Sequence, residues 1–129
     1  MKYLLDTHVL IWIATEPAHL PHATALLVGD RRNEIFFSAV SAFEISTKHR
    51  IGKLPGGERI LIGFDRLLER LGAVELPVRS RHGVLAGQLE WENRDPFDRL
   101  LAAQSVTEDL VLVTSDRGFA SVEGLQTIW

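Results

Sequence analysis

Four acidic residues occupy positions where an α/β fold would bring them to one edge of a sheet: Asp6, Glu44, Asp98 and Asp116. Asp6 ends an apolar opening run, and Asp116 follows the run 110–115. Carboxylates that follow parallel strands gather in the crevice beyond the carboxyl edge of the sheet, where open α/β sheets bind their ligands. Clustered carboxylates repel one another unless a cation neutralises them, and their hard oxygen atoms suit Mg²⁺ or Mn²⁺. The pattern therefore predicts a metal site.

Glu44 is the acid with the weakest structural explanation. Phe43 and Ile45 flank it in an otherwise apolar and small-residue stretch that is expected to be helical. Its structural alternative is an i, i+4 pair with Lys48, which contributes only a few tenths of a kcal/mol. A buried carboxylate without a counter-ion costs several times that amount. The balance favours a functional role for Glu44.

The acids at the two helix starts have structural alternatives. Asp6, or Thr7 after it, could cap the helix that follows the first strand. Asp95 can cap a later helix whose first residue is proline, and Asp98, three residues on, could complete a capping box. Asp95 is the better candidate for a purely structural cap, so Asp98 is kept as a candidate ligand.

Asp116 could serve only as a turn residue or as another cap. Thr114 and Ser115 directly precede it. Their hydroxyl groups could orient a carboxylate or bind a water held by a metal ion. Each acid alone is a weak signal, and the four together at strand ends and helix starts are a stronger one.

The composition is that of one ordinary globular domain. The chain has 129 residues, of which 46% are hydrophobic and 24% charged, which is close to the globular average. No stretch approaches the ~20 apolar residues that span a bilayer, and the apolar run before Asp6 is too short for a signal peptide. The absence of cysteine excludes disulfides and thiolate metal sites and suits a reducing cytoplasm. We therefore expect a cytoplasmic protein without membrane contact.

The formal net charge of −3 does not by itself indicate a nucleic-acid binder. If metal ions hold the four acids, however, the remaining surface is close to neutral or positive. Local basic clusters then become candidate contacts for RNA phosphates, and each has the alternative of being a solvated face. The candidates are Lys48, Arg50, Arg94 and Arg99.

Hydrophobic periodicity predicts an alternation of strands and helices. Strands are expected over 2–6, 34–38, 73–76, 110–114 and 125–129, and helices over 7–15, 22–29, 40–50, 58–71, 79–89 and 96–108. Gly72 fits the position just past the helix over 58–71. Such an alternation is typical of an α/β fold with a mostly parallel central sheet and helices on both faces. Without repeats or linkers, residues 1–129 are expected to form a single domain.

Several of these segments resemble the PIN-domain nucleases, and within them the VapC-type toxins of bacterial type II toxin–antitoxin pairs. The piece Asp95-Pro96-Phe97-Asp98-Arg99 is quite specific to one branch, whose members often carry a histidine where this chain has Asn93. The matching pieces span nearly the whole chain: Leu4 to His8, Ser38 to Ile45, Asp95 to Gln104 and Leu112 to Asp116.

The resemblance implies a PIN-like domain with metal-dependent endoribonuclease activity. It implies that Asp6, Glu44, Asp98 and Asp116 are the acidic quartet, with Mg²⁺ or Mn²⁺ as the cofactor and RNA as the substrate. It further implies a small VapB-like protein antitoxin as partner. The expected assembly is a homodimer or a toxin–antitoxin hetero-oligomer. An antitoxin tail would lie in a groove and direct a basic or aromatic side chain toward the acidic pocket.

Hydrolysis of a phosphodiester needs an activated water in line with the leaving oxygen and neutralisation of the charge on the phosphate. Our hypothesis assigns Asp6 and Asp98 as the principal metal ligands, directly or through water. Glu44 would position or deprotonate the attacking water, and Asp116 would serve a second ion. Attack by water would leave a 5′-phosphate and a 3′-hydroxyl.

Two alternative functions come from other classes. A receiver-type signalling domain also gathers acids and Mg²⁺ at its sheet edge, but it needs a lysine after a late strand. The only lysines here are Lys2, Lys48 and Lys53. A PIN-like domain that binds RNA without cleaving it is the other alternative, and the presence of all four acids argues against it.

The three tryptophans, Trp12, Trp91 and Trp129, could stack on bases as aromatic residues do in single-strand binders. A tryptophan in a small domain more often lies in the core or at an interface. Trp12, between Val9 and Ile13 on the first expected helix, is expected to pack in the core or against a partner.

Overall fold

A five-stranded parallel sheet forms the centre of the molecule in the computed structural model, which describes residues 1–129. The strands lie in the order β3-β2-β1-β4-β5, and every neighbouring pair is parallel. In the central register Leu4 of β1 lies opposite Phe36 of β2 and Leu112 of β4. The strands are β1 (Lys2–Leu5), β2 (Glu34–Ser38), β3 (Val74–Leu76), β4 (Val111–Val113) and β5 (Thr127–Ile128).

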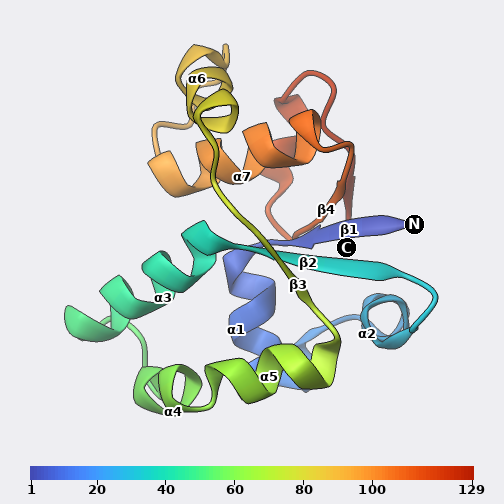
Figure 1. Ribbon diagram of the computed structural model, residues 1–129, viewed down its shortest axis with the longest axis vertical. Helices are drawn as coiled ribbons and strands as arrows, with labels where there is room; N and C mark the ends of the chain where they lie inside the picture. Colours follow the sequence, from blue (N-terminus) through green and yellow to red (C-terminus); the bar gives the residue numbers. More distant parts are fainter.

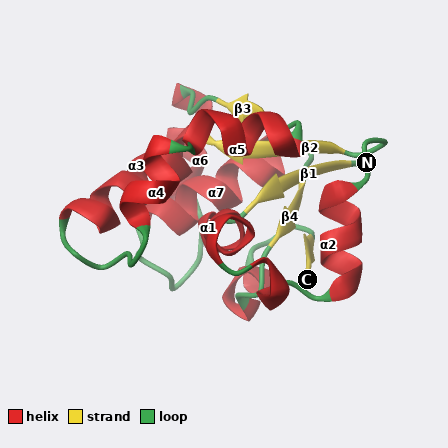
Figure 2. Cartoon of the chain, turned by 90° about the horizontal axis from the view of Figure 1, so that it is seen from below, coloured by secondary structure: helices red, strands yellow, loops and turns green.

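Helices cover both faces of this sheet. Figure 1 shows α1, α4 and α5 on one side and α6 and α7 on the other, and Figure 2 shows the same layers from below. None of the helices combines the length and hydrophobicity that crossing a bilayer requires. The α-helices are α1 (Thr7–Thr15), α2 (His22–Gly29), α3 (Ala39–Arg50), α4 (Gly57–Ile62), α5 (Phe64–Leu71), α6 (Ser80–Gln88) and α7 (Pro96–Thr107), with 3₁₀ turns η1 (Pro17–His19) and η2 (Arg117–Ser121).

The side-chain alternation of β1 divides the core into two parts, because successive residues of a strand point to opposite faces. Tyr3 and Leu5 belong to the larger cluster, which includes Val9 and Leu10 of α1 and Leu67 of α5. Leu4 belongs to the smaller cluster, with Leu101 and Ala102 of α7 and Leu112 of β4. The sequence of a strand that is buried on both faces is a continuous apolar run, as in the opening segment.

The predicted α/β fold is confirmed, and one predicted helix is wrong in its length. The helix expected over 58–71 is divided by Gly63 into α4 and α5. The Gly63 N–H still bonds to the Arg59 carbonyl at 3.0 Å, but the backbone at Gly63 departs from helical geometry. Glycine has a low helix propensity and is a common site of kinks. The apolar spacing on either side of Gly63 was sufficient to suggest one long helix.

Strand order excludes the receiver-type alternative. Receiver domains have the flavodoxin-like order 2-1-3-4-5, whereas this sheet has the order β3-β2-β1-β4-β5. Most other boundaries agree with expectation within a residue or two, although β4 and β5 are shorter than predicted. Gly72 ends α5 with a φ of 62°, the left-handed conformation expected of a glycine just past a helix.

Candidate acidic site

Asp6 lies at the junction of β1 and α1 and is 3% exposed. It stands at the N-cap position of α1, but its side chain makes no capping hydrogen bond. Instead its Oδ2 accepts a hydrogen bond from Thr114 Oγ1 at 2.7 Å, and Thr114 Oγ1 accepts one from the Asp116 N–H at 3.0 Å. The structural explanation that we considered for Asp6, a helix cap, is not realised. The carboxylate is held in place from the neighbouring strand.

Glu44 lies on α3 and is 4% exposed. Ser38 starts this helix, because its Oγ accepts a hydrogen bond from the Val40 N–H at 3.0 Å. Glu44 Oε2 lies 2.7 Å from Lys48 Nζ in the i, i+4 ion pair that the sequence suggests. Lys48 therefore places one positive charge beside the buried Glu44 carboxylate, where a counter-ion is needed.

Asp98 lies in the first turn of α7, which Asp95 caps through hydrogen bonds from the N–H groups of Phe97 and Asp98. Asn93 Nδ2 donates to Asp98 Oδ2 at 2.9 Å. Burial raises the pKa of Asp98 to about 6, against the lowering effect of the Asn93 hydrogen bond. The negative charges of Asp95, Asp6 and Glu44 raise this pKa further. Asp98 therefore shares one electrostatic environment with the two buried acids, Asp6 and Glu44.

Asp116 follows β4 at the same edge of the sheet but is oriented differently. Its side chain is the N-cap of η2, where Oδ1 accepts a hydrogen bond from the Gly118 N–H at 2.8 Å. Unlike Asp6 and Glu44, Asp116 is exposed. The capping role considered from sequence is therefore realised, and the link between Asp116 and the buried acids runs through Thr114.

One carboxylate oxygen of Asp98 and one of Glu44 are held, while the other oxygen of each remains available. Asp98 Oδ1 and Glu44 Oε1 accept no hydrogen bond, whereas the second oxygen of each is bonded to Asn93 or Lys48. Neither free oxygen is among the fully buried polar atoms that lack a partner, so both retain access to solvent. Asp6 Oδ1 lies 3.9 Å from His8 Nδ1. The site thus presents accessible carboxylate oxygens at the carboxyl edge of the sheet.

The donor chemistry of this site fits a hydrated Mg²⁺ or Mn²⁺. As the side chains stand, no three Asp, Glu or His residues converge closely enough to enclose an ion. Mg²⁺ keeps several waters and needs only one or two carboxylates, so full enclosure by protein is not required. The half-buried Asp98 and the buried Glu44 each have one free oxygen, and together with Asp6 they meet that requirement.

Two supporting residues have different environments. Thr7 is fully buried, and its Oγ1 lies 2.8 Å from Ser41 Oγ, so the two hydroxyls connect the start of α1 to α3. This contact fixes Asp6 relative to Glu44. Ser115 is exposed, and its role remains a prediction.

The four candidate phosphate contacts also differ. Lys48 is paired with Glu44, while Arg50 and Arg94 are exposed. The structure gives Arg99 a different role from the one that we expected. Its guanidinium donates to four backbone carbonyls between α6 and α7: Ala86, Leu89, Trp91 and Asn93. Four of its five N–H groups are thereby occupied, and Arg99 holds the loop that carries Asn93.

Sequence reasoning missed Asn93 and His8. Asn93 was noted only as the residue found where similar sequences often have histidine, and the structure shows it bonded to Asp98. His8 is half exposed, and the Asp6 carboxylate, whose Oδ1 lies 3.9 Å from His8 Nδ1, raises the pKa of the imidazole. The signal available for His8 was its spacing, since a residue two positions after Asp6 lies in the same first turn of α1.

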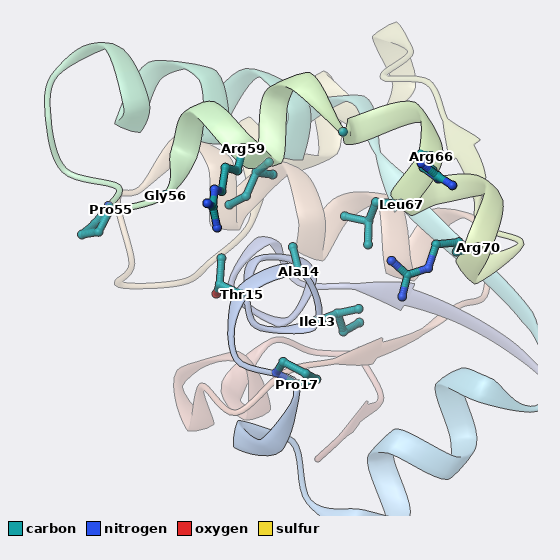
Figure 3. A pocket seen from close by; sticks show the side chains of 12 residues that line it. Ile13, Ala14, Thr15, Pro17, Pro55, Gly56, Arg59, Arg66, Leu67 and Arg70 are labelled. Carbon is teal, nitrogen blue, oxygen red and sulfur yellow. The ribbon is translucent and has the colours of Figure 1, made fainter.

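A groove lies away from the acids, between α1 and the pair α4 and α5 (Figure 3). It has a volume of about 600 Å³. Apolar side chains form its floor, and three arginines from α4 and α5 line it without an acidic partner within salt-bridge distance. The residues that define this basic groove are Ile13, Ile60, Leu67, Arg59, Arg66 and Arg70.

The sheet is parallel, has the strand order given above and carries buried carboxylates at its carboxyl edge. Together these features define a class of small α/β domains with an acidic edge site. The family model for the PIN domain matches residues 3–125. The chain therefore belongs to the PIN-domain family.

Comparisons with individual proteins agree. The chain is 27% identical over 118 residues to ribonuclease VapC22 of Mycobacterium tuberculosis, covering 92% of this chain and 89% of that protein. It is similar to a chain of VapBC2 from Rickettsia felis bound to a promoter DNA fragment, with a TM-score of 0.74, 20% identity and coverage of 100% and 99%. A chain of DNA-bound VapBC from Salmonella typhimurium gives a TM-score of 0.71, 21% identity and coverage of 99% and 97%.

Proposed function

We propose that this protein is a metal-dependent endoribonuclease that acts in the cytoplasm as the toxin of a toxin–antitoxin pair. The observation that carries the proposal is the group formed by the buried carboxylates of Asp6 and Glu44 and the half-buried carboxylate of Asp98 at the carboxyl edge of a PIN-domain sheet. Ribonuclease VapC22, whose length the chain nearly covers, supports RNA as the substrate.

Asp6 and Asp98 would hold Mg²⁺ or Mn²⁺ with Glu44, and Asp116 is proposed to serve a second ion. When bound, such an ion supplies positive charge against the phosphate and acidifies a water molecule. Thr114 and Asn93 act by orienting Asp6 and Asp98, because each donates to one carboxylate oxygen and leaves the other free. Their donors are uncharged, so the carboxylates keep their full negative charge for the cation.

Glu44 is proposed to accept the proton of the attacking water. Its free oxygen, Oε1, retains access to solvent, while Lys48 holds the other oxygen. The new bond from the water oxygen to phosphorus replaces the bond from phosphorus to the 3′-oxygen. One product then carries a 5′-phosphate, and the departing 3′-oxygen takes up a proton and becomes the 3′-hydroxyl of the other.

The test is cleavage of total RNA by the purified protein, with mapping of the product ends. We expect cleavage with Mg²⁺ or Mn²⁺ and none with EDTA. Asp6→Asn, Glu44→Gln and Asp98→Asn should each lower the rate at least a hundredfold, since each removes charge from the metal site. Asp65→Asn, an exposed acid of α5, is the matched control and should cleave normally. Undiminished cleavage in EDTA, or by folded Asp98→Asn protein, would contradict the proposal.

We also propose a small protein antitoxin as the partner. The related structures are described as VapBC assemblies, and the basic groove of this chain offers an apolar floor with three unpaired arginines. An amphipathic segment with acidic side chains would complement such a groove. Because the groove is separate from the acids, a partner could bind there and still extend to the acidic site.

A further inference from the structure

Four rings lie in contact along one side of α1 and are not explained by the acidic site. Trp12 is central: its ring centroid lies 4.0 Å from that of His19, 5.6 Å from that of Trp129 and 6.1 Å from that of His8. We call His8, Trp12, His19 and Trp129 the aromatic row. They come from α1, η1 and the end of β5, so the fold and not local sequence brings them together.

The aromatic row begins at the acidic site. His8 Nδ1 lies 3.9 Å from Asp6 Oδ1, and Trp12 follows one helical turn later. His19 and Trp129 both contact Trp12, and Trp129 follows Ile128, whose carbonyl accepts a hydrogen bond from the Thr114 N–H. An RNA phosphate bound at Asp6 would therefore have these rings beside it.

The rings remain accessible although they contact one another. The His8 side chain is 54% exposed, Trp129 is 38% exposed, and His19 is also exposed. Trp12 is half-buried. Trp12 packs against the larger core cluster, and Trp91 packs against the smaller one and against the buried Phe119 at 5.3 Å. Core packing thus accounts for Trp91 and for part of Trp12, but not for the exposure of His8, His19 and Trp129.

We propose that the aromatic row is a subsite on which the bases of single-stranded RNA stack next to the scissile phosphate. This inference rests on the proposed function and names its substrate class. Stacking on aromatic side chains is tolerant of base identity and requires bases that are free of a duplex. A double helix presents its phosphates outward and its bases inward, so it cannot use this row. The protein should therefore prefer unpaired segments of RNA.

The basic groove does not compete with this assignment. Its lining and the aromatic row share no residue, although both involve α1. A partner protein in the groove and RNA on the row can therefore be tested separately.

Tryptophan fluorescence provides the direct test, because base stacking quenches indole emission. Two variants separate the signals: Trp91→Phe retains only the tryptophans of the aromatic row, and the double variant Trp12→Phe, Trp129→Phe retains only Trp91. Both would carry Asp98→Asn, so that binding is measured without cleavage. The ligands are a single-stranded 12-nucleotide RNA, the same strand with abasic residues, and its duplex.

We expect the single strand to quench the Trp91→Phe protein and to leave the emission of Trp91 unchanged in the double variant. The abasic strand and the duplex should bind the Trp91→Phe protein at least tenfold more weakly. Equal binding and quenching by the abasic strand would overturn the inference, since phosphates alone would then account for binding.

A second measurement uses His19 in the protein with intact acids. His19→Ala should raise KM for the single strand about tenfold with kcat nearly unchanged, and His19→Tyr, which keeps a ring, should restore most of the loss. Equal KM for His19→Ala and the unaltered protein would contradict stacking at this position. Circular dichroism confirms that each variant is folded. If RNA quenches the fluorescence but the unaltered protein cleaves no RNA, the nuclease proposal is refuted and the stacking subsite stands. If the protein cleaves RNA but quenching does not depend on the bases, the stacking subsite is refuted and the nuclease proposal stands.

Discussion

At the scale of single residues, the acidic site depends on uncharged donors as much as on the acids. Thr114 and Asn93 each donate to one oxygen of a carboxylate. Such hydrogen bonds orient the carboxylate without neutralising it, so the cost of its burial remains until a cation arrives. The site is therefore expected to destabilise the metal-free protein.

Asp98→Asn tests that expectation. Because Asp98 is ionised less readily in the folded chain, with a pKa of about 6, the free energy of unfolding falls as pH rises from about 4 to about 6. Asparagine abolishes this loss. At pH 7.5 in EDTA the variant should be more stable by about 1–2 kcal/mol, a value reduced for the solvent screening of a half-exposed group. Urea denaturation measures the difference.

The pH dependence is the control for this prediction. At pH 4 Asp98 is protonated in the folded state, so the variant and the unaltered protein should have nearly equal stability. With Mg²⁺ at pH 7.5 the order should approach reversal, because binding stabilises only the protein that keeps its carboxylate. If Asp98→Asn protein is less stable than the unaltered protein at pH 7.5 in EDTA, the charge of Asp98 does not destabilise the folded state.

The sequence could predict the acids but not their donors. Asp6 and Glu44 could be selected because an acid stands out beside buried apolar residues. Asn93 could not, since an asparagine two residues before Asp95 looks like an ordinary loop residue, and only the fold places its amide on Asp98. The sequence correctly placed Asp116 after the strand β4. It could not show that the Asp116 carboxylate would cap η2.

At the scale of elements, Arg99 connects α7 to the loop after α6. Its guanidinium bonds to four carbonyls, from Ala86 to Asn93. The backbone that carries Asn93 is therefore fixed relative to the helix that carries Asp98. A second connection is Gln104, a buried residue that accepts from Ser38 Oγ at 2.6 Å and so ties α7 to the start of α3.

Arg99→Lys should weaken the fold and the site together. Lysine keeps the charge but lacks the planar fork, so it cannot reach the same carbonyls. We expect a loss of about 2–3 kcal/mol in the free energy of unfolding and a lower cleavage rate, because Asn93 loses its support. The matched control is Arg94→Lys, an exposed residue of the same loop. If Arg99→Lys and Arg94→Lys unfold at the same urea concentration, the loop is held by other contacts.

Helices and strands were predictable where apolar periodicity and caps agreed. Asp95-Pro96 fixed the start of α7, and Gly72 fixed the end of α5. Gly63 was the exception, because the apolar spacing of 58–71 continues through it while the backbone does not. Periodicity reports which face is buried and is insensitive to a kink that preserves that face.

At the scale of the whole molecule, α1 separates two surfaces with different chemistry. The aromatic row lies along one part of this helix, and its residue Ile13 contributes to the basic groove (Figure 3). Strand alternation made a parallel sheet predictable, but neither surface could be predicted, because each joins segments that are distant in sequence. Arg59 of α4 and Arg70 of α5, for example, line the same groove as Ile13 and Ala14 of α1.

Charge reversal in the groove tests the proposed antitoxin contact. Arg59→Glu with Arg70→Glu should weaken binding of the proposed antitoxin at least tenfold and leave RNA cleavage by the free protein unchanged. Lys53→Glu, an exposed residue outside the groove lining, is the control. Isothermal titration calorimetry measures the affinity. Unaltered affinity in the double variant would place the antitoxin elsewhere.

The two outer strands of the sheet are short. β3 has three residues and β5 has two, so each lateral border offers few free backbone groups to a neighbouring molecule. Long unprotected borders invite strands from other copies to join and polymerise. With such brief borders, copies released from their protein partner at high local concentration should remain dispersed and not assemble into fibres.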